Sequence, residues 1–247
     1  MLSEMPEDDW NEEPPTRESS VVVQSSRERA VEDWRQRTAW YLRQVGVPGI
    51  FCDKTWADFQ LVAGKTQALR EARQWCHSRC AGGGLLFTGP VGAGKSLLAA
   101  LCVRDWLRDG RSWHMSDSPR RWYDRGGEEA WEPGILWTSV SDLLRGVRYR
   151  CFDLKQSSED REMSALRTVP LLVLDDIGVR ALSEWGHDFL LAAVDDRYSE
   201  SCTTIVTSNL DLAGLARVLE ERISSRLAGM CRVVEVGGED MRRKGRG

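Results

Sequence analysis

The sequence from residue 89 to residue 96 is Gly89-Pro90-Val91-Gly92-Ala93-Gly94-Lys95-Ser96. The first glycine and the final Gly-Lys-Ser fit the pattern of a phosphate-binding loop, called the P-loop below. The glycines let backbone N–H groups curl around a phosphate without Cβ clashes. The Lys95 ammonium can then reach the β- and γ-phosphates, and the Ser96 hydroxyl can bind Mg²⁺. We therefore predict that these eight residues bind ATP, and that Ser96 also binds the metal.

The residues on either side of the P-loop indicate that it joins a strand to a helix. Residues 85–88 form a short apolar run that predicts a buried strand, and residues 96–109 predict a helix that ends at Gly110. The N-terminus of such a helix directs its unpaired amides at an anion. A glycine-rich turn that binds nothing is the alternative, and this context disfavours it.

The composition is typical of a folded globular chain. Its 247 residues are 41% hydrophobic and 29% charged. The acidic N-terminus lacks the basic and apolar regions of a signal peptide, and no apolar run approaches the roughly 20 residues of a membrane span. Seven scattered cysteines indicate reduced thiols rather than a disulfide framework. We therefore expect a cytoplasmic protein without a membrane partner, and no metal other than Mg²⁺ bound with the nucleotide.

Four segments can be distinguished along the chain. Residues 1–25 are acidic, contain proline and lack periodic apolar positions, which predicts disorder. Residues 26–47 predict one amphipathic helix, which must either dock on the main domain or bind a partner, because such a helix is unstable in isolation. Residues 48–242 are expected to form the ATPase domain, and residues 243–247 a basic tail.

Strands alternate with helices through the expected ATPase domain. Besides residues 85–88, four apolar runs predict strands, at 135–140, 171–175, 203–208 and 232–236. This alternation predicts an α/β fold in which helices cover both faces of a parallel sheet. Residues 111–134 are rich in Trp, Gly and Arg and predict a long surface insertion.

Two carboxylates, Asp175 and Asp176, follow the apolar run at 171–174. An unbroken apolar run is typical of a strand buried on both faces, and ligands of open α/β sheets bind at the carboxyl ends of such strands. We therefore predict that Asp175 holds Mg²⁺, directly or through water, and that Asp176 polarises the attacking water as a general base. Two acids in an exposed turn are the alternative, and the accompanying P-loop argues against it.

Three further polar residues are candidates for the same chemistry. The run at 203–208 and the following Asn209 end in a polar tip, where an asparagine or a threonine could orient water near the γ-phosphate, although asparagine is also a routine turn residue. Arg222 and Arg226 are four residues apart and share one face of a predicted helix. Arginine is suited to stabilising charge on a transferring phosphoryl group, whereas a solvated basic patch is the alternative.

Taken together, these motifs resemble the AAA+ ATPases, and within them the DnaC/IstB-like group of helicase loaders and transposition helper ATPases. The resemblance extends from about residue 48 to residue 242. It rests on the sequences at 89–96, 172–178, 205–210 and 221–229. The paired aspartates and the ending at 234–242 are similar to this group in particular.

The resemblance implies a fold and a set of roles. The fold is a P-loop NTPase of the AAA+ type with a five-stranded parallel sheet in the order 5-1-4-3-2. Asn209 is implied to be the sensor-1 residue, and Arg242 a second sensor that binds nucleotide. Arg226, with Arg222 as its substitute, is implied to be an arginine finger that reaches the site of a neighbouring subunit. ATP and single-stranded or duplex DNA are implied to promote a homo-oligomer.

The function implied first is an ATP-hydrolysing loader of the replicative helicase in DNA replication. A transposition helper that delivers a transposase to target DNA is the alternative, because the core motifs are shared. Arg145, Arg148 and Arg150 are the candidate DNA contacts, and a solvated helix face explains them equally well. A small-molecule P-loop kinase is disfavoured by the motifs at 205–210 and 221–229. A nucleotide-gated interaction protein with negligible turnover stays open.

Overall fold

The computed structural model describes residues 21–63, 66–78, 83–108, 134–153, 163, 166–167, 169–179, 181–238 and 240–241. The chain divides into two compact units, residues 1–37 and residues 38–247. The second unit contains the sheet and all of the candidate site residues. Among the described residues, no helix combines the length and the apolar composition that crossing a membrane requires.

The described residues form one sheet of parallel strands. The strands are β1 (Gly84–Thr88), β2 (Ile135–Ser139), β3 (Leu171–Ile177), β4 (Thr203–Ser208) and β5 (Cys231–Glu235). Their spatial order is β2-β3-β4-β1-β5, and every neighbouring pair is parallel. Read from the other edge, this is 5-1-4-3-2, so the fold implied by the sequence motifs is confirmed. β1 and β4 lie side by side in the middle, which brings their carboxyl ends together.

Helices precede and connect these strands. They are α1 (Val21–Gln44), the 3₁₀ helix η1 (Gly49–Phe51), α2 (Trp56–Ala63), α3 (Gln67–His77), α4 (Lys95–Arg108), α5 (Val140–Asp153), α7 (Glu184–Ser199), α8 (Leu212–Leu219) and α9 (Glu221–Met230). Residues 21–25 belong to α1, whereas we expected disorder up to residue 25. They are uncharged and contain neither Gly nor Pro, so nothing in them stops a helix.

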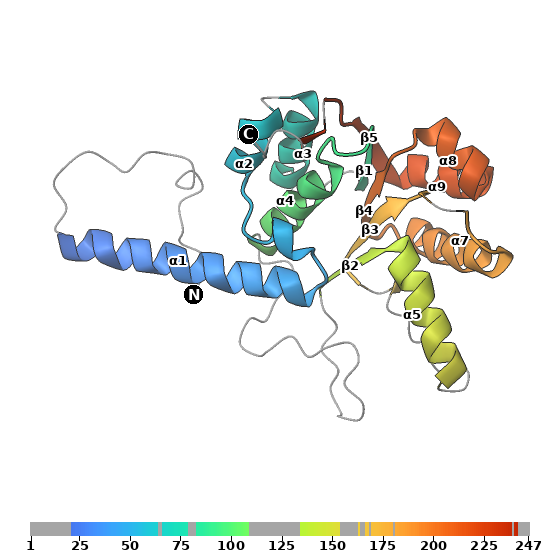
Figure 1. The fold of residues 1–247 in the computed structure, drawn as a ribbon, viewed down its shortest axis with the longest axis horizontal. Helices are drawn as coiled ribbons and strands as arrows, with labels where there is room; N and C mark the ends of the chain where they lie inside the picture. The colour runs from blue at the N-terminus through green and yellow to red at the C-terminus, as the bar shows by residue number, and fades with distance from the viewer. Residues whose placement is uncertain are drawn as a thin grey trace. The chain divides into compact units, whose positions relative to one another are not determined.

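Two apolar clusters cover the two faces of the sheet. Successive side chains of a strand point to opposite faces, so Leu85 and Phe87 pack with α3 and α4, whereas Leu86 packs with α5, α7, α8 and α9. Figure 1 shows the same division, with α3 and α4 on one side of the strands and α7, α8 and α9 on the other. All three side chains are fully buried. Such burial on both faces explains why β3 is apolar at every position from residue 171 to residue 174.

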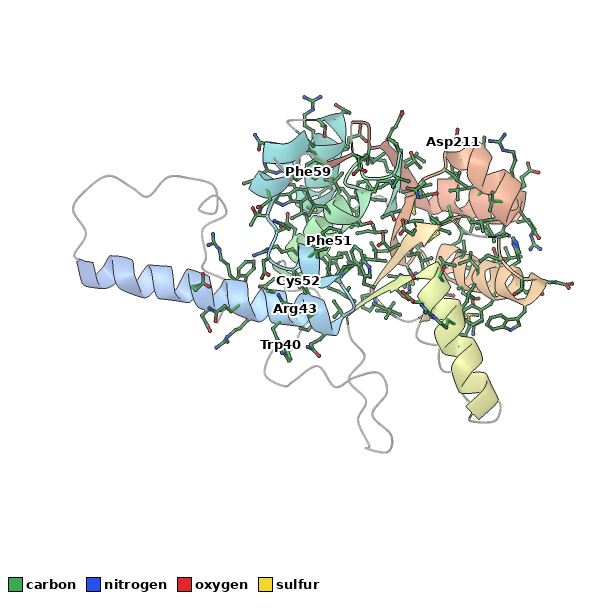
Figure 2. All side chains as sticks on the ribbon, viewed as in Figure 1. Trp40, Arg43, Phe51, Cys52, Phe59 and Asp211 are labelled. Atoms are coloured by element: carbon green, nitrogen blue, oxygen red, sulfur yellow. The ribbon has the colours of Figure 1, made fainter. Side chains whose placement is uncertain are left out.

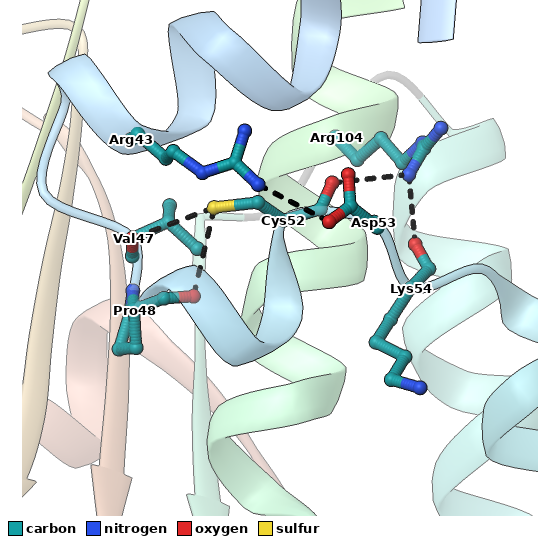
Figure 3. Close-up of polar contacts among 7 residues, drawn as sticks. All are labelled: Arg43, Val47, Pro48, Cys52, Asp53, Lys54 and Arg104. Atoms are coloured by element: carbon teal, nitrogen blue, oxygen red, sulfur yellow. Dashed lines mark hydrogen bonds and ion pairs between the residues drawn. The ribbon is translucent and has the colours of Figure 1, made fainter. Parts of the chain in front are cut away.

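Helix α4 also holds the chain that follows α1 (Figure 3). Arg104, which is almost completely buried, donates hydrogen bonds to the carbonyl oxygens of Cys52 (3.5 Å) and Lys54 (2.8 Å). The Cys52 thiol donates in turn to the carbonyl oxygens of Val47 (3.6 Å) and Pro48 (3.5 Å). These contacts satisfy backbone acceptors in an irregular segment and fix it against the helix that begins at the P-loop.

A second buried arginine joins α7 to the sheet. The Arg197 guanidinium donates to the carbonyl oxygens of Leu166 (2.6 Å), Val169 (2.9 Å) and Thr203 (2.5 Å), and to the Thr204 hydroxyl (2.9 Å). Burial lowers its pKa to about 10, so it is still protonated at neutral pH. One cation therefore satisfies polar groups before β3 and at the start of β4.

Replacing Arg197 with alanine should lower the free energy of unfolding by about 1–3 kcal/mol, the usual cost of leaving a buried polar group without its partner. The change removes a buried side chain and leaves the carbonyl oxygens of three residues without this donor. Urea unfolding followed by circular dichroism measures the loss. The matched control is Arg217→Ala, at an exposed arginine of α8, which should stay within about 0.5 kcal/mol. Equal effects of the two changes would contradict this role of Arg197.

Candidate nucleotide site

The P-loop occupies the turn between β1 and α4, as predicted. All three of its glycines have backbone angles that other residues rarely adopt, with φ of 137° at Gly89, 81° at Gly92 and 96° at Gly94. A Cβ on Gly92 would lie 2.0 Å from a carboxylate oxygen of Asp240, and one on Gly94 would lie 2.8 Å from the Phe59 ring. The glycines are therefore required both by the turn and by the chain packed around it.

The Lys95 side chain folds back over the P-loop. Its ammonium donates to the carbonyl oxygens of Gly89 (2.8 Å) and Pro90 (2.7 Å), and only 5% of the residue is exposed. These acceptors belong to the first two residues of the loop, so the positive charge is held above the turn. This is the position from which a lysine can meet phosphate oxygens.

Asp175 lies at the base of the P-loop. Its carboxylate oxygen Oδ1 accepts hydrogen bonds from the Ser96 hydroxyl (2.8 Å) and the Thr207 hydroxyl (2.6 Å). Burial raises the pKa of Asp175, while the two hydrogen bonds and the nearby charge of Lys95 act in the opposite direction. The structure thus brings together the two predicted metal ligands, Ser96 and Asp175, and adds Thr207, whose contact with Asp175 the sequence did not predict.

The residues present fit a magnesium ion bound with a nucleotide. A hydroxyl and a buried carboxylate are oxygen donors of the kind that Mg²⁺ prefers, and a cation would compensate the burial of the Asp175 charge. Among the described residues, no group of three or more His, Cys, Asp or Glu side chains gathers as a metal cluster. Phosphate oxygens and water would therefore have to supply further ligands, as is usual for Mg²⁺.

Asp176 has a different setting from its neighbour. The pairing of β3 with β4 shifts register between Leu174 and Ile177, which identifies a bulge at the two aspartates. The φ angle of Asp176 is 57°, in the left-handed region, and the residue is exposed, whereas Asp175 is buried. The bulge therefore separates a buried carboxylate from one that solvent can reach. Asparagine and aspartate tolerate this conformation better than most residues do.

Asn209 follows β4, between the ends of β1 and β3. The turn that holds it is fixed on both sides: the Ser208 hydroxyl donates to the carbonyl oxygen of Ile177 (2.9 Å) and accepts from the Leu210 amide (3.0 Å). Asp211 then caps α8 by accepting from the Gly214 amide (2.7 Å; Figure 2). Asn209 is half-buried. Because β4 and β1 are parallel neighbours, Asn209 and the P-loop follow the carboxyl ends of adjacent strands, at the same edge of the sheet.

The chain after β5 also borders the P-loop. The Val236 amide donates to the carbonyl oxygen of Thr88 (2.7 Å), and the Met241 amide donates to that of Gly92 (2.9 Å). The Met241 sulfur lies 2.6 Å from the position of a Cβ on Gly94, next to the fully buried Phe59 of α2 (Figure 2). Arg242, the expected second sensor, lies outside the described residues.

The two arginines of α9 contact a different part of the protein. Arg226 forms an ion pair with Asp195 of α7, and an Arg222 nitrogen lies 3.7 Å from the other oxygen of that carboxylate. Helix α9 leads into β5, and its last residue, Met230, approaches Gly83 before β1. Arg226 therefore lies toward the amino ends of the strands, whereas the P-loop follows their carboxyl ends. The structure does not bring Arg226 to the nucleotide site of its own chain.

The expected DNA contacts are described only in part. Arg145 is exposed on α5 and pairs with Asp142, three residues before it on the same helix. The side chains of Arg148 and Arg150 lie outside the described residues. An exposed pair of this kind contributes little to stability, so Arg145 can exchange its partner for another anion at small cost.

Comparisons with known proteins find related sequences and structures. Residues 132–247 match the family of IstB-like ATP-binding proteins. The chain carries an IstB/DnaC-like ATP-binding domain. It is 26% identical over 165 residues to the replicative helicase loader DnaC of Escherichia coli K12, and 28% identical over 167 residues to an insertion sequence ATP-binding protein of Sinorhizobium fredii. Each match covers 66% of this chain and 58% of the relative, so the chain spans somewhat over half the length of these relatives.

Solved structures confirm the fold of this domain. The crystal structure of the DnaC helicase loader superposes with a TM-score of 0.55 at 22% identity, covering 70% of this chain and 92% of that one. The replication initiator DnaA, solved with AMPPCP and single-stranded DNA, gives a TM-score of 0.58 at 16% identity, covering 78% of this chain and 52% of that one. These similarities establish the AAA+ type of sheet and helix arrangement.

Proposed function

We propose that this protein binds and hydrolyses ATP and acts on DNA as a loader of a replicative helicase. The observation that carries the proposal is the meeting of Ser96 and Asp175, 2.8 Å apart at the base of a P-loop whose lysine is held over the turn. The similarity to helicase loaders supports the partner class. A protein with this role is expected to work in the cytoplasm, as the scattered cysteines predict.

The residues of this chain divide the work of hydrolysis. When bound, Mg²⁺ supplies positive charge that neutralises phosphate oxygens. The P-loop amides and Lys95 hold the phosphates, and Ser96 and Asp175 hold the metal in the proposed site. Asp176, exposed beside the buried Asp175, accepts a proton from water, and Asn209 orients that water. Arg226 of a neighbouring protomer supplies positive charge to the transferring phosphoryl group.

The helix before the ATPase domain is proposed to bind the helicase. α1 belongs to the unit of residues 1–37 up to Arg37, and from Thr38 onward it belongs to the unit that holds the sheet. Ala39 and Leu42 in this later part are buried in the apolar cluster of that unit. We therefore assign partner binding to the earlier part of the helix.

A transposition helper is the second candidate, because the insertion sequence ATP-binding protein is as similar to this chain as DnaC is. Mixing the protein with the replicative helicase or the transposase of its own organism, followed by gel filtration with ATP, separates the two. Co-elution with the helicase supports the loader, and co-elution with the transposase alone overturns it in favour of the helper.

The ATPase proposal predicts Mg²⁺-dependent hydrolysis that single-stranded DNA changes. Steady-state phosphate release, measured with and without Mg²⁺ and DNA, tests this prediction. DNA affinity should fall steeply as salt rises, because phosphate contacts release counterions. Lys95→Ala is the control and should lose nucleotide binding, measured with a fluorescent ATP analogue. Nucleotide binding by the native protein that is independent of Mg²⁺ and insensitive to Lys95→Ala would contradict the proposal.

A further inference from the structure

We infer that Thr207 positions both aspartates of the nucleotide site, fixing the carboxylate of Asp175 and the backbone that turns Asp176 outward. The inference rests on the proposed function, since it assigns a residue to the same hydrolysis. Thr207 lies on β4, the strand beside β3, and none of its surface is exposed. Because it is buried, its hydroxyl can act only on the groups packed around it.

The Thr207 hydroxyl is used in both directions. It donates to the Asp175 oxygen Oδ1 (2.6 Å) and accepts from the Asp176 backbone amide (2.9 Å). A hydroxyl has one proton to donate and lone pairs to accept, so the two bonds do not compete. The bond to a carboxylate is charge-assisted and is the stronger of the two kinds. One side chain therefore links the proposed metal ligand to the backbone of the proposed base.

This link coincides with the bulge in β3. Leu174 pairs with Val206 and Ile177 pairs with Ser208, so on the β4 side the two aspartates lie opposite the single residue Thr207. A bulge leaves ladder groups without their regular partners, and the Thr207 hydroxyl provides the partner for the Asp176 amide. The left-handed φ of 57° at Asp176 is uncommon for a residue other than glycine and persists only where surrounding contacts hold it.

The two bonds have separable consequences. If the Thr207 hydroxyl no longer donates, Asp175 loses one of its two hydroxyl partners and keeps the hydrogen bond from Ser96. The Asp175 carboxylate is then less well oriented toward a metal. Partners that orient metal ligands typically change metal affinity or activity by about 10–100-fold. Without the acceptor, the bulge relaxes and the Asp176 carboxylate loses its direction. Thr207 is thus a positioning residue that acts through both aspartates.

The test compares Thr207→Val with Thr207→Ser. Valine keeps the shape and removes the hydroxyl, so we expect kcat to fall by about 10–100-fold and the Mg²⁺ concentration for half-maximal rate to rise by a similar factor. Nucleotide affinity without Mg²⁺ should be unchanged. Serine restores the hydroxyl and should restore both parameters. If valine does not fold, Thr207→Ala removes the hydroxyl without introducing a branched apolar group.

Thr204→Val is the matched control, because it removes another buried hydroxyl of β4. That hydroxyl accepts from Arg197 (2.9 Å) and donates to the carbonyl oxygen of Cys202 (3.2 Å), at the far end of the strand from Asp175. The variant should keep the native dependence on Mg²⁺. Native Mg²⁺ dependence and kcat in Thr207→Val, or the same losses in Thr204→Val, would overturn the inference.

A second readout separates failure of this inference from failure of the proposed function. The increase in ADP affinity caused by Mg²⁺, measured by calorimetry, needs no hydrolysis. If the native protein hydrolyses no ATP, the proposed function fails, and a smaller Mg²⁺-linked gain in Thr207→Val than in Thr207→Ser still supports the inference. An equal gain in the two variants would overturn it.

Discussion

Replacing Arg226 with alanine lowers the rate of ATP hydrolysis by about 10³–10⁵-fold, the contribution of a finger arginine in other P-loop enzymes. Nucleotide affinity stays at the native level, because Arg226 contacts Asp195 and the Arg222 carbonyl in its own chain rather than the P-loop. Phosphate release and fluorescent nucleotide titration measure the two quantities separately. A loss of only about tenfold would be too small for this role.

The ion pair between Arg226 and Asp195 bears on how Arg226 reaches a neighbouring site. In the isolated protomer the guanidinium is paired, so it must exchange a carboxylate for a phosphate when a neighbour presents one. Arg217→Ala on α8 is the control for loss of a positive charge, since that arginine is exposed. It should leave the hydrolysis rate at the native level, whereas an equal loss would point to a general effect of charge.

Replacing Asp176 with asparagine should slow hydrolysis by about 10²–10⁴-fold, the usual contribution of a positioned acid or base. Asparagine keeps the size of the side chain and tolerates the left-handed backbone at this bulge, so folding should be preserved. ATP affinity should stay native, because Asp175 and Ser96 still form the proposed metal site. Single-turnover hydrolysis and nucleotide titration measure the outcome. Equal loss of binding and turnover would refute the role of Asp176 as base.

Asp175→Asn provides the contrast to this variant. Asp175 is buried and accepts hydrogen bonds from two hydroxyls, whereas Asp176 is exposed. Asparagine at 175 should therefore weaken Mg²⁺-dependent nucleotide binding itself. If the two asparagine variants show the same nucleotide affinity and the same hydrolysis rate, the separate roles assigned to Asp175 and Asp176 are wrong.

The sequence was sufficient for the sheet and the P-loop for physical reasons. The glycines of the P-loop indicate its conformation, because Gly92 and Gly94 adopt backbone angles that other residues avoid. The run at 171–174 is apolar at every position, as a strand covered on both faces requires. The strand order was implied by the family motifs and not by the pattern itself.

Other parts of the site could not be predicted because they depend on tertiary contacts. Thr207 is one polar residue in a buried strand, and only the register of β4 against β3 places it opposite the aspartates. The left-handed φ of Asp176 could not be predicted either, because an Asp-Asp pair occurs both in turns and in strands. The approach of Met241 to Gly92 joins residues almost 150 positions apart, and no local pattern encodes such a contact.

A mixing experiment tests the central claim, that one protomer binds ATP and its neighbour completes the site. Arg226→Ala retains the binding site without the finger, and Asp176→Asn retains the finger and binds ATP without the base. Each is expected to be nearly inactive alone. Mixed in equal amounts they should regain ATP hydrolysis, because random assembly pairs an intact site with an intact finger at about a quarter of the interfaces. A mixture no more active than the sum of its parts would contradict the claim.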